Sequence, residues 1–350
     1  MNHRRVAAAG ALAAVAVVAA LTSGALSAQN QTAADTPAEA AAWTPSRTAW
    51  GDPDLQGVWR YEATIALERP REFGDRAFLT DEEVAERERA EQEQAANRLA
   101  GLDGEAVGRR PVSESPIRGN EYNAFWQDHG RAGKVYRQTS LIVDPPDGRL
   151  PYTPDARQAA ARAVARYGVG PYESYLAPDT GERCLTDGVT ALMWQGPNGG
   201  HNRIVQSPGF VTILHEEYRD RRIIPVGRAD APPHRPVRQW LGDAVGRWEG
   251  DTLVVDTTHV LDRTNYEWAS LWTRASDTLH LVERFQRVGA DTMEYTIMVE
   301  DPKTFTSPWT AIIPISRLSE DVQIYEYACH EGNYAMPNLL RGGRADAGKE

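Results

Sequence analysis

Between Arg203 and Cys329 the sequence is a succession of short runs rich in β-branched and aromatic residues, separated by Gly, Asp and Pro. Short runs of this kind between turn-forming residues are typical of β-strands. Consecutive strands without intervening helices favour an antiparallel meander that closes into a barrel or folds into a sandwich. We therefore predict a mainly β core over residues 201–334, either a lipocalin-like barrel or a sandwich. The expected strands are 210–218, 221–226, 252–258, 278–288, 292–299, 309–315 and 323–329.

Two helical segments precede this β-rich part. Residues 80–99 begin with a capping box, Thr80 and Glu83, and carry only a thin apolar stripe, which predicts a surface helix. Residues 153–167 begin with Thr-Pro, a typical helix start. Both helices are expected to be peripheral. The predicted regions around the core are an N-terminal helical and loop region at 49–200, packed on the sheet, and a tail at 335–350.

The N-terminus has the features of a secretory signal peptide. Residues 1–5 are basic, residues 6–21 are apolar, and small residues follow. An N-terminal membrane anchor is the less favoured alternative, because the run is short for a span and no charge cluster follows it. We predict a signal peptide at 1–28 and a flexible leader at 29–48. The mature protein is then periplasmic or secreted, with no membrane attachment.

The charge balance argues against some classes of partner. The chain has 38 Lys and Arg against 49 Asp and Glu, a formal net charge of −11. Removal of Arg4 and Arg5 with the signal peptide leaves 36 basic residues against 49 acidic ones, or −13. No basic patch stands out, which disfavours nucleic acid and anionic membranes. The expected partner is a small-molecule ligand or substrate.

The chain has two cysteines, Cys184 and Cys329. Export would place them in an oxidising compartment, where paired thiols persist as disulfides. One bridge between them is the simplest prediction, and two buried free thiols are the alternative. The bridge would close a loop of about 145 residues and, in the chain-entropy model, stabilise the fold by roughly 4–5 kcal/mol.

Distinctive phrases recur along the chain, among them PDLQGVW at 53–59, GRWEGDTLVVDT at 246–257, HLVERF at 280–285 and YEYACHEGNY at 325–334. They resemble the recurring phrases of a large family of exported proteins of unknown function in environmental bacteria. The resemblance extends over most of the chain after the signal peptide. It implies export and a shared architecture, and it carries over no catalytic residue.

The predicted strand 210–218 contains a candidate acid–base pair. Residues two apart on a strand share a face, so His215 and Glu217 lie together at the end of an apolar face, with Glu216 on the other side. An imidazole oriented by a carboxylate suits general acid–base catalysis. The alternative is a solvated pair at the point where the strand leaves the core.

Other polar residues on the predicted strands favour structural roles. Thr257 and His259 share a face, and Asp256 lies on the other, where a buried carboxylate would need a partner. A structural ion pair is favoured over catalysis for Asp256. His280 and Glu283 face opposite ways and are interpreted as alternating polar positions. The candidate partners of Asp256 are Arg222, Arg238, Arg247 and Arg284.

If the YEYACHEGNY phrase forms a strand, its side chains also alternate between the two faces of that strand. Tyr325, Tyr327, Cys329 and Glu331 would share one face, with His330 on the other. Adjacent residues point apart, which argues against a nucleophile pair of Cys329 and His330. His330 or Glu331 can still complete a site that other strands assemble.

No metal or other cofactor is predicted. The sequence contains no HExxH, CxxC or short HxH motif. A zinc site would require histidines from separate strands to converge, which the spacing does not specify. The histidines in question are His201, His215, His259, His280 and His330.

The β-rich half is also rich in Trp and Tyr. Aromatic side chains that line a cavity would suit a small, largely apolar ligand. The loop 265–272 is a candidate lid, and its alternative role is to plug one end of a barrel. The predicted substrate-binding residues are Tyr218, Arg222, Trp240, Trp268 and Trp272.

Three functions follow from these features. The first is an exported, cofactor-independent lyase, isomerase or hydrolase whose catalytic residues are His215 and Glu217, helped by His259, His330 or Glu331. The second is a non-catalytic periplasmic protein that binds a small molecule. The third is an interaction module in which the β-rich part is only a scaffold.

Overall fold

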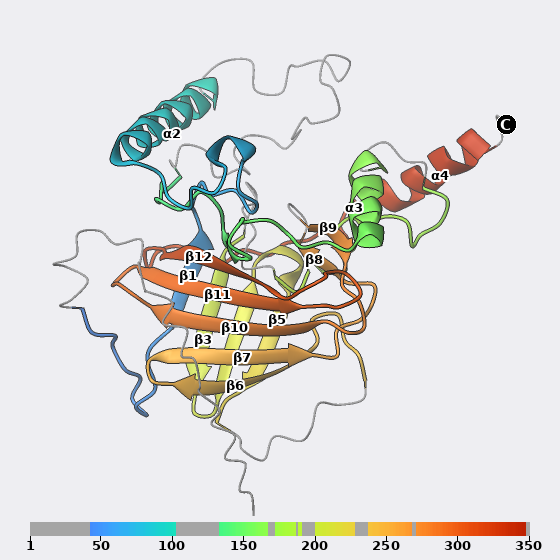
Figure 1. Ribbon diagram of the computed structural model, residues 1–350. Coiled ribbons are helices and arrows are strands. Elements are labelled where there is room, and N and C mark those ends of the chain that lie inside the picture. The colour runs from blue at the N-terminus through green and yellow to red at the C-terminus, as the bar shows by residue number, and fades with distance from the viewer. Residues whose placement is uncertain are drawn as a thin grey trace, which may run out of the picture. The chain divides into compact units, whose positions relative to one another are not determined.

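The structure is a computed structural model (Figure 1). Everything it describes belongs to one compact unit, residues 35–350. The predicted signal peptide and most of the predicted leader lie outside the described residues. No helix in the described part of the chain has the length and apolar character needed to cross a bilayer. The described residues are 43–102, 133–166, 172–186, 188–190, 200–227, 237–267 and 271–347.

Ten strands form one antiparallel sheet, in the order β5-β4-β3-β1-β12-β11-β10-β7-β6, with β2 paired to β12 off this path. A bridge between Val226 and Gly246 brings the two edges together, so the sheet forms a nearly closed barrel. The mainly β prediction is confirmed, and the barrel is the alternative that holds. The strands are β1 (Gly57–Tyr61), β2 (Ile142–Asp144), β3 (Asn202–Ser207), β4 (Phe210–His215), β5 (Arg221–Pro225), β6 (Asp243–Glu249), β7 (Thr252–Thr258), β10 (His280–Arg287), β11 (Thr292–Glu300) and β12 (Trp309–Arg317). A separate ribbon consists of β8 (Asn265–Glu267) and β9 (Leu271–Arg274).

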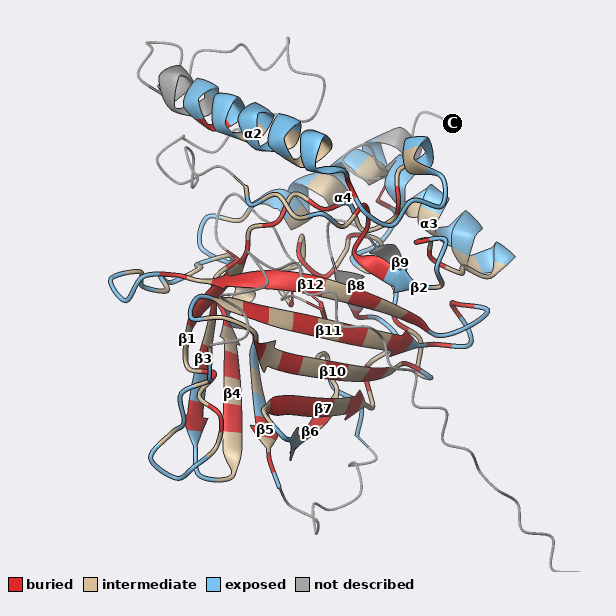
Figure 2. Ribbon diagram, turned by 60° about the vertical axis from the view of Figure 1, so that its left-hand side comes forward, coloured by how far each residue is buried: buried red, intermediate tan, exposed pale blue. Residues whose placement is uncertain are grey.

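The core lies inside the barrel. Every second residue of β10 and β11 is buried, as the alternating colours of Figure 2 show. Side chains alternate across a strand, so this pattern places one face of each strand inward. Burial of each large apolar side chain contributes about 1.5–3 kcal/mol, which makes the inward face the main source of stability. The largest fully buried side chains include Trp59, Trp309, Tyr295 and Phe285.

Two helices in the N-terminal half begin as predicted. Before α2 (Asp81–Leu102), the N–H of Thr80 donates to Glu83 Oε2 over 2.8 Å, and the N–H of Glu83 donates to Thr80 Oγ1 over 3.2 Å. Most of the described surface of α2 is exposed (Figure 2). Before α3 (Pro154–Arg166), Thr153 Oγ1 accepts from the N–H of Ala156. These caps use N–H groups that the helix itself leaves unpaired.

The predicted C-terminal tail contains a third helix, α4 (Ala335–Ala347). It lies against Tyr172, since a Cβ added at Gly343 would be 2.3 Å from the backbone oxygen of Tyr172. Glycine therefore permits the close approach of this helix. Short 3₁₀ turns complete the described elements, η1 (Arg71–Phe73) and η5 (Glu217–Arg219).

Two of the predicted strands were wrong, the first at its C-terminal end and the second over its whole length. β4 ends at His215, and the chain turns through η5, where Tyr218 and Arg219 have φ angles of 53° and 54°. The strand predicted at 323–329 does not form, and residues 322–328 have no regular structure. Its side chains have no buried face to fill, since Tyr325 is 73% exposed.

Candidate functional site

The end of the β4–β5 hairpin carries polar side chains into the barrel. The register places Ile213 opposite Arg222, and the N–H of His215 donates to the backbone oxygen of Asp220 over 2.8 Å. His215 shares the inward face of buried Ile213, and Asp220 and Arg222 alternate in step with buried Ile224. The hairpin therefore brings an imidazole, a carboxylate and a guanidinium to one end of the barrel interior.

These side chains line a cavity. It comprises about 300 Å³ with the open solvent at its mouth included, and the free space within it suffices for about one water molecule. Apolar walls with a few polar groups are typical of small-molecule sites. The described lining residues are Gly188, Val189, Asn202, Ile213, His215, Asp220, Arg222 and Leu241.

Asn202 determines which ring nitrogen of His215 carries a proton. Asn202 Nδ2 donates to the carbonyl of Gly200 over 3.1 Å, so its Oδ1 is the atom that lies 2.9 Å from His215 Nδ1. An amide oxygen only accepts, and Nδ1 therefore donates to it. Both side chains belong to buried residues. In the neutral ring the proton therefore sits on Nδ1 and not on Nε2.

An ion pair adjoins the cavity inside the barrel. Arg222 Nη1 donates to Glu283 Oε1 over 2.8 Å, and Nη2 donates to Glu283 Oε2 and, over 2.9 Å, to Thr257 Oγ1. The hydroxyl of Tyr295 donates to Glu283 Oε1 over 2.8 Å. Glu283 is fully buried. A buried carboxylate is tolerated because these donors replace the hydrogen bonds it would make to water.

The ion pair also sets the protonation of its neighbours. Burial tends to lower the pKa of the Arg222 guanidinium, but the charge and hydrogen bonds of Glu283 outweigh burial and raise that pKa. Burial, and then the charge of Glu283, raises the pKa of the Tyr295 phenol well above its usual value. The cluster therefore contains a cation, an anion and a neutral phenol. Arg222 Nε remains a buried donor without a hydrogen-bond partner.

The segment before β3 forms part of the cavity wall. Thr186 Oγ1 donates to Asp220 Oδ2 over 2.5 Å, and Gly188 and Val189 line the cavity. Cys184 lies two residues before Thr186. The position of this wall thus depends on what fixes Cys184.

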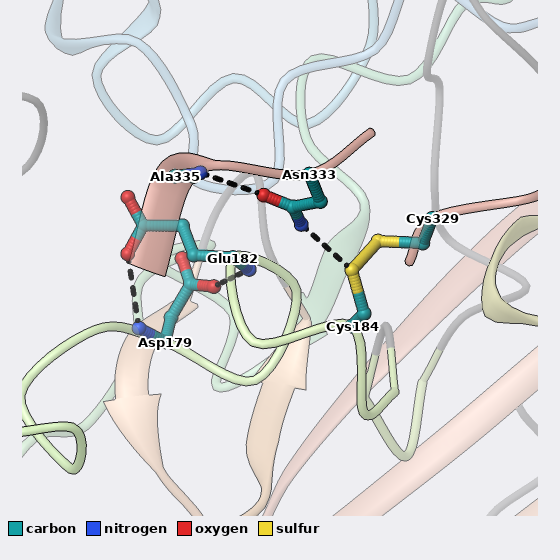
Figure 3. Close-up of a disulfide and its surroundings, with 6 residues drawn as sticks. All are labelled: Asp179, Glu182, Cys184, Cys329, Asn333 and Ala335. Atoms are coloured by element: carbon teal, nitrogen blue, oxygen red, sulfur yellow. Dashed lines mark hydrogen bonds between the residues drawn. A yellow bond between two sulfur atoms is a disulfide. The ribbon is translucent and has the colours of Figure 1, made fainter. Parts of the chain in front are cut away.

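Cys184 is fixed by the predicted disulfide, which is present: its sulfur is bonded to that of Cys329, with the two Cα atoms 5.6 Å apart (Figure 3). Asn333 Nδ2 donates to Cys184 Sγ over 3.0 Å, and Asn333 Oδ1 accepts from the N–H of Ala335, the first residue of α4. The disulfide therefore ties the C-terminal segment to the segment of the cavity wall.

Two carboxylates lie close to the disulfide (Figure 3). The N–H of Asp179 donates to Glu182 Oε2 over 3.1 Å, and the N–H of Glu182 donates to Asp179 Oδ1 over 2.7 Å. Burial, followed by the charge of Asp179, raises the pKa of Glu182 to about 7. This part of the chain therefore changes charge near neutral pH.

An imidazole–carboxylate pair, His201 and Glu216, lies outside the described cavity lining. His201 Nδ1 is 2.5 Å from Glu216 Oε2, and Glu216 Oε1 accepts from the N–H of Tyr325 over 2.9 Å. Burial tends to raise the pKa of Glu216, but the bonds from His201 and Tyr325 outweigh it and lower that pKa. Glu216 thus holds the irregular C-terminal segment against the end of β4.

The predicted catalytic residues are spread over the structure. His215 lines the cavity, whereas Glu217 is buried in η5 outside the described lining. His259 follows the end of β7 with a φ of 57°, so the predicted shared face with Thr257 was wrong. His330 and Glu331 are exposed and lie outside the described lining.

The predicted substrate-binding residues show a similar spread. Arg222 lines the cavity, and Tyr218 instead packs its ring against Tyr327 at 5.1 Å. Trp240 precedes the lining residue Leu241, and its carbonyl accepts from Thr264. Trp268 and the Trp272 side chain lie outside what the structure describes. The described lining contains no Trp or Tyr.

Some functional candidates were missed in the sequence. Asn202 and Asp220 belong to the cavity, and Glu283 is a core residue although it was interpreted as an alternating polar position. The sequence did contain a signal for this, because Glu283 alternates with Leu281 and Phe285 and therefore shares the apolar face of the strand. Asp256 Oδ2 bonds His280 Nε2 at 2.9 Å, a partner that the sequence did not suggest.

Within the described residues, no three His, Cys, Asp or Glu side chains are grouped so as to hold a metal ion. Comparison of the chain with protein families, with curated proteins and with solved structures found no match. The function must therefore be argued from the site itself.

Proposed function

We propose that this protein is an exported, cofactor-independent enzyme that performs acid–base chemistry on a small, largely apolar molecule. His215 is the proton-transferring residue. The observation that carries the proposal is the Asn202–His215 hydrogen bond at the wall of the cavity, which holds the imidazole in one orientation. Fixed orientation of an acid–base group is a general requirement of such catalysis.

The surroundings of His215 fit this role. Asp220 lines the same cavity, and its negative charge would favour the imidazolium that forms when His215 takes up a proton. Val189, Ile213 and Leu241 supply an apolar surface for the rest of a substrate. A lyase or isomerase step needs only a proton acceptor and donor, which one histidine provides.

The test is to incubate the purified protein with a mixture of small metabolites and to follow the composition by mass spectrometry. We expect a compound that wild type converts and that H215Q converts at least about a hundredfold more slowly, the usual range for loss of a general acid or base. H280Q is the matched control, because His280 lies on the outer face of β10, away from the cavity. Full turnover by H215Q would remove His215 from the mechanism.

A small-molecule-binding protein is the second candidate. Its support is the cavity itself, whose described lining combines apolar side chains with a few polar groups, as small-molecule sites do. A compound that copurifies with the protein and is recovered unchanged after long incubation would favour this function over catalysis.

Export itself is part of the proposal, and the Cys184–Cys329 disulfide supports it because disulfides persist in oxidising compartments. The intact mass of the protein from the periplasm or medium of an expressing bacterium tests it. We expect the mass of a chain that begins near residue 29, and an uncleaved chain would contradict the signal peptide.

A further inference from the structure

One wall of the cavity belongs to a segment built from turns. In the described part of residues 180–190 the chain forms turns and no helix or strand. The N–H of Cys184 donates to the backbone oxygen of Gly181 over 2.8 Å. The N–H of Leu185 donates in the same way to Thr180 over 2.9 Å. Such local bonds shape the turns but do not attach them to the barrel, so the position of this wall depends on side-chain links to other elements.

Side-chain links of this kind lie next to the cavity. Thr186 Oγ1 donates to Asp220 Oδ2 over 2.5 Å, and two residues earlier Cys184 is bonded to Cys329. Thr186 is fully buried, and Val189 after it lines the cavity. The bridge therefore anchors the segment beside the residues that form the wall.

Cys184 has a backbone conformation that needs a restraint. Its φ is 53°, in the left-handed region, which is unfavourable for a residue with a Cβ atom. Such a conformation persists only where the surrounding structure enforces it. The bond to Cys329 is a restraint of this kind, because it fixes the side chain of Cys184. Without the bridge, relaxation of φ to a negative value would redirect the chain at Cys184 and displace the wall residues that follow.

The partner cysteine belongs to a segment that packs on the other side of the cavity wall. The ring of Tyr327, two residues before Cys329, packs against that of Tyr218 in η5 at 5.1 Å. η5 leads directly into Asp220, which lines the cavity. A Cβ added at Gly181 would lie 2.9 Å from the hydroxyl oxygen of Tyr218. Three segments therefore meet at Tyr218, and the disulfide cross-links two of them.

We propose that oxidation of Cys184 and Cys329 completes the cavity, so that the protein becomes active after export and is inactive while its thiols are reduced. This inference rests on the proposed function and names the regulation of the same site. The oxidant is a dithiol–disulfide oxidant of the receiving compartment. One cysteine thiolate attacks its disulfide to form a mixed disulfide, and the second thiolate displaces the oxidant sulfur. Two protons and two electrons leave the protein, and the oxidant is released as a dithiol.

Hydrogen–deuterium exchange, read by mass spectrometry, tests the wall without any ligand. Peptides that cover residues 180–190 should exchange at least about tenfold faster in C184S/C329S than in oxidised wild type. M293A is the matched control, because Met293 is fully buried on β11, outside the described cavity lining. Its truncation destabilises the barrel while the bridge stays intact. Exchange of the wall as in wild type, or an increase no larger than that in M293A, would overturn the proposal.

If C184S/C329S does not fold, reduction of folded wild type gives the same comparison. Tris(2-carboxyethyl)phosphine is added under native conditions, and the protein is pulse-labelled while its circular dichroism is still that of the folded barrel. Faster exchange over residues 180–190 as the two thiols appear supports the proposal. Unchanged exchange with both thiols free contradicts it.

Activity is read separately, with a compound that wild type converts and H215Q converts far more slowly. Turnover by oxidised wild type that falls at least about tenfold in C184S/C329S supports both the redox control and the acid–base function. Equal turnover by the two proteins leaves the acid–base function intact and overturns the redox control. A faster-exchanging wall with no compound converted supports redox control of the cavity and counts against the proposed enzyme.

Discussion

Arg222 and Glu283, which are 61 residues apart in the sequence, form a bidentate ion pair inside the barrel. Arg222 comes from edge strand β5, and Glu283 comes from β10, which is not its neighbour in the sheet. The pair therefore links two parts of the barrel wall across its interior. It is buried on both sides, with side-chain exposures of 11% and 0%.

Removal of one partner should destabilise the fold strongly. E283A leaves the Arg222 cation buried without an anion, and loss of one member of a buried pair costs about 3–5 kcal/mol. The double variant R222M/E283L removes both charges and should be more stable than E283A. The free energy of unfolding is measured by urea titration. A double variant less stable than E283A would show that the pair contributes more than mutual neutralisation.

The fold was largely predictable because strands and helix starts are local signals. The Thr80–Glu83 capping box and the alternation of β10 and β11 depend on residues close in the sequence. Closure of the barrel is not local, since Val226 and Gly246 meet from the two edges of the sheet. This contact decided between a barrel and a sandwich, and nothing in the strand pattern encodes it.

The site was less predictable for the same reason. His215 was found from its strand, but the expected partner Glu217 assumed that the strand continued beyond His215. Glu216 already has helical dihedral angles, φ −68° and ψ −49°, so the alternation ends before Glu217, and Asp220 lines the cavity in its place. Asn202 bonds His215 from the neighbouring strand, a relationship fixed by the register alone.

Loss of the disulfide should destabilise the protein. C184S/C329S opens a loop closed over a separation of 145 residues, and the chain-entropy model gives a loss of about 5 kcal/mol. The free energy of unfolding of wild type and variant is compared under non-reducing conditions. A thiol assay on denatured, unreduced wild type should find no free thiol, and two titratable thiols would contradict the bridge.

Glu182 should make stability depend on pH. Its pKa is about 7 in the folded protein and lies near 4.5 when unperturbed, so the folded state holds the proton more tightly. The contribution of Glu182 to stability is then fully present below pH 4.5 and is lost as the pH rises through about 7. E182Q should lose less stability than wild type between pH 5 and pH 8. Thermal unfolding measures this difference, and identical pH profiles would contradict the raised pKa.

His280 is a base and Glu182 is an acid, but both have a raised pKa, so His280 should also make stability fall as the pH rises. Burial tends to lower its pKa, but hydrogen bonds and charge from Asp256, then Glu300, outweigh burial and raise it. Its contribution to stability is present below pH 6.5 and is lost as the pH rises through the raised folded value. The side chains of His280 and Asp256 are each about one-third exposed, so we expect their pair to contribute under about 1 kcal/mol to the free energy of unfolding.

NMR titration of the His280 ring measures this effect directly. The pKa should fall in D256N, which removes the carboxylate 2.9 Å from Nε2. E300Q should lower it less, because Glu300 lies 3.4 Å from Nδ1 and is more exposed. A larger effect of E300Q than of D256N would reverse the assignment of partners.

Asn202 should hold the His215 ring in position and also influence the protonation of that ring. N202D replaces the amide acceptor with a carboxylate, which should raise the pKa of His215 because a negative charge favours the imidazolium. N202L removes the acceptor and leaves Nδ1 of a buried ring without its bond, which should reduce turnover of any identified substrate by about tenfold or more. The pH profile of the turnover rate separates these effects. N202D should shift the profile to higher pH, whereas a purely structural role would change its height and not its position. An unchanged profile in N202D, with the His215 ring titrating as in wild type, would exclude Asn202 as the residue that positions the acid–base group.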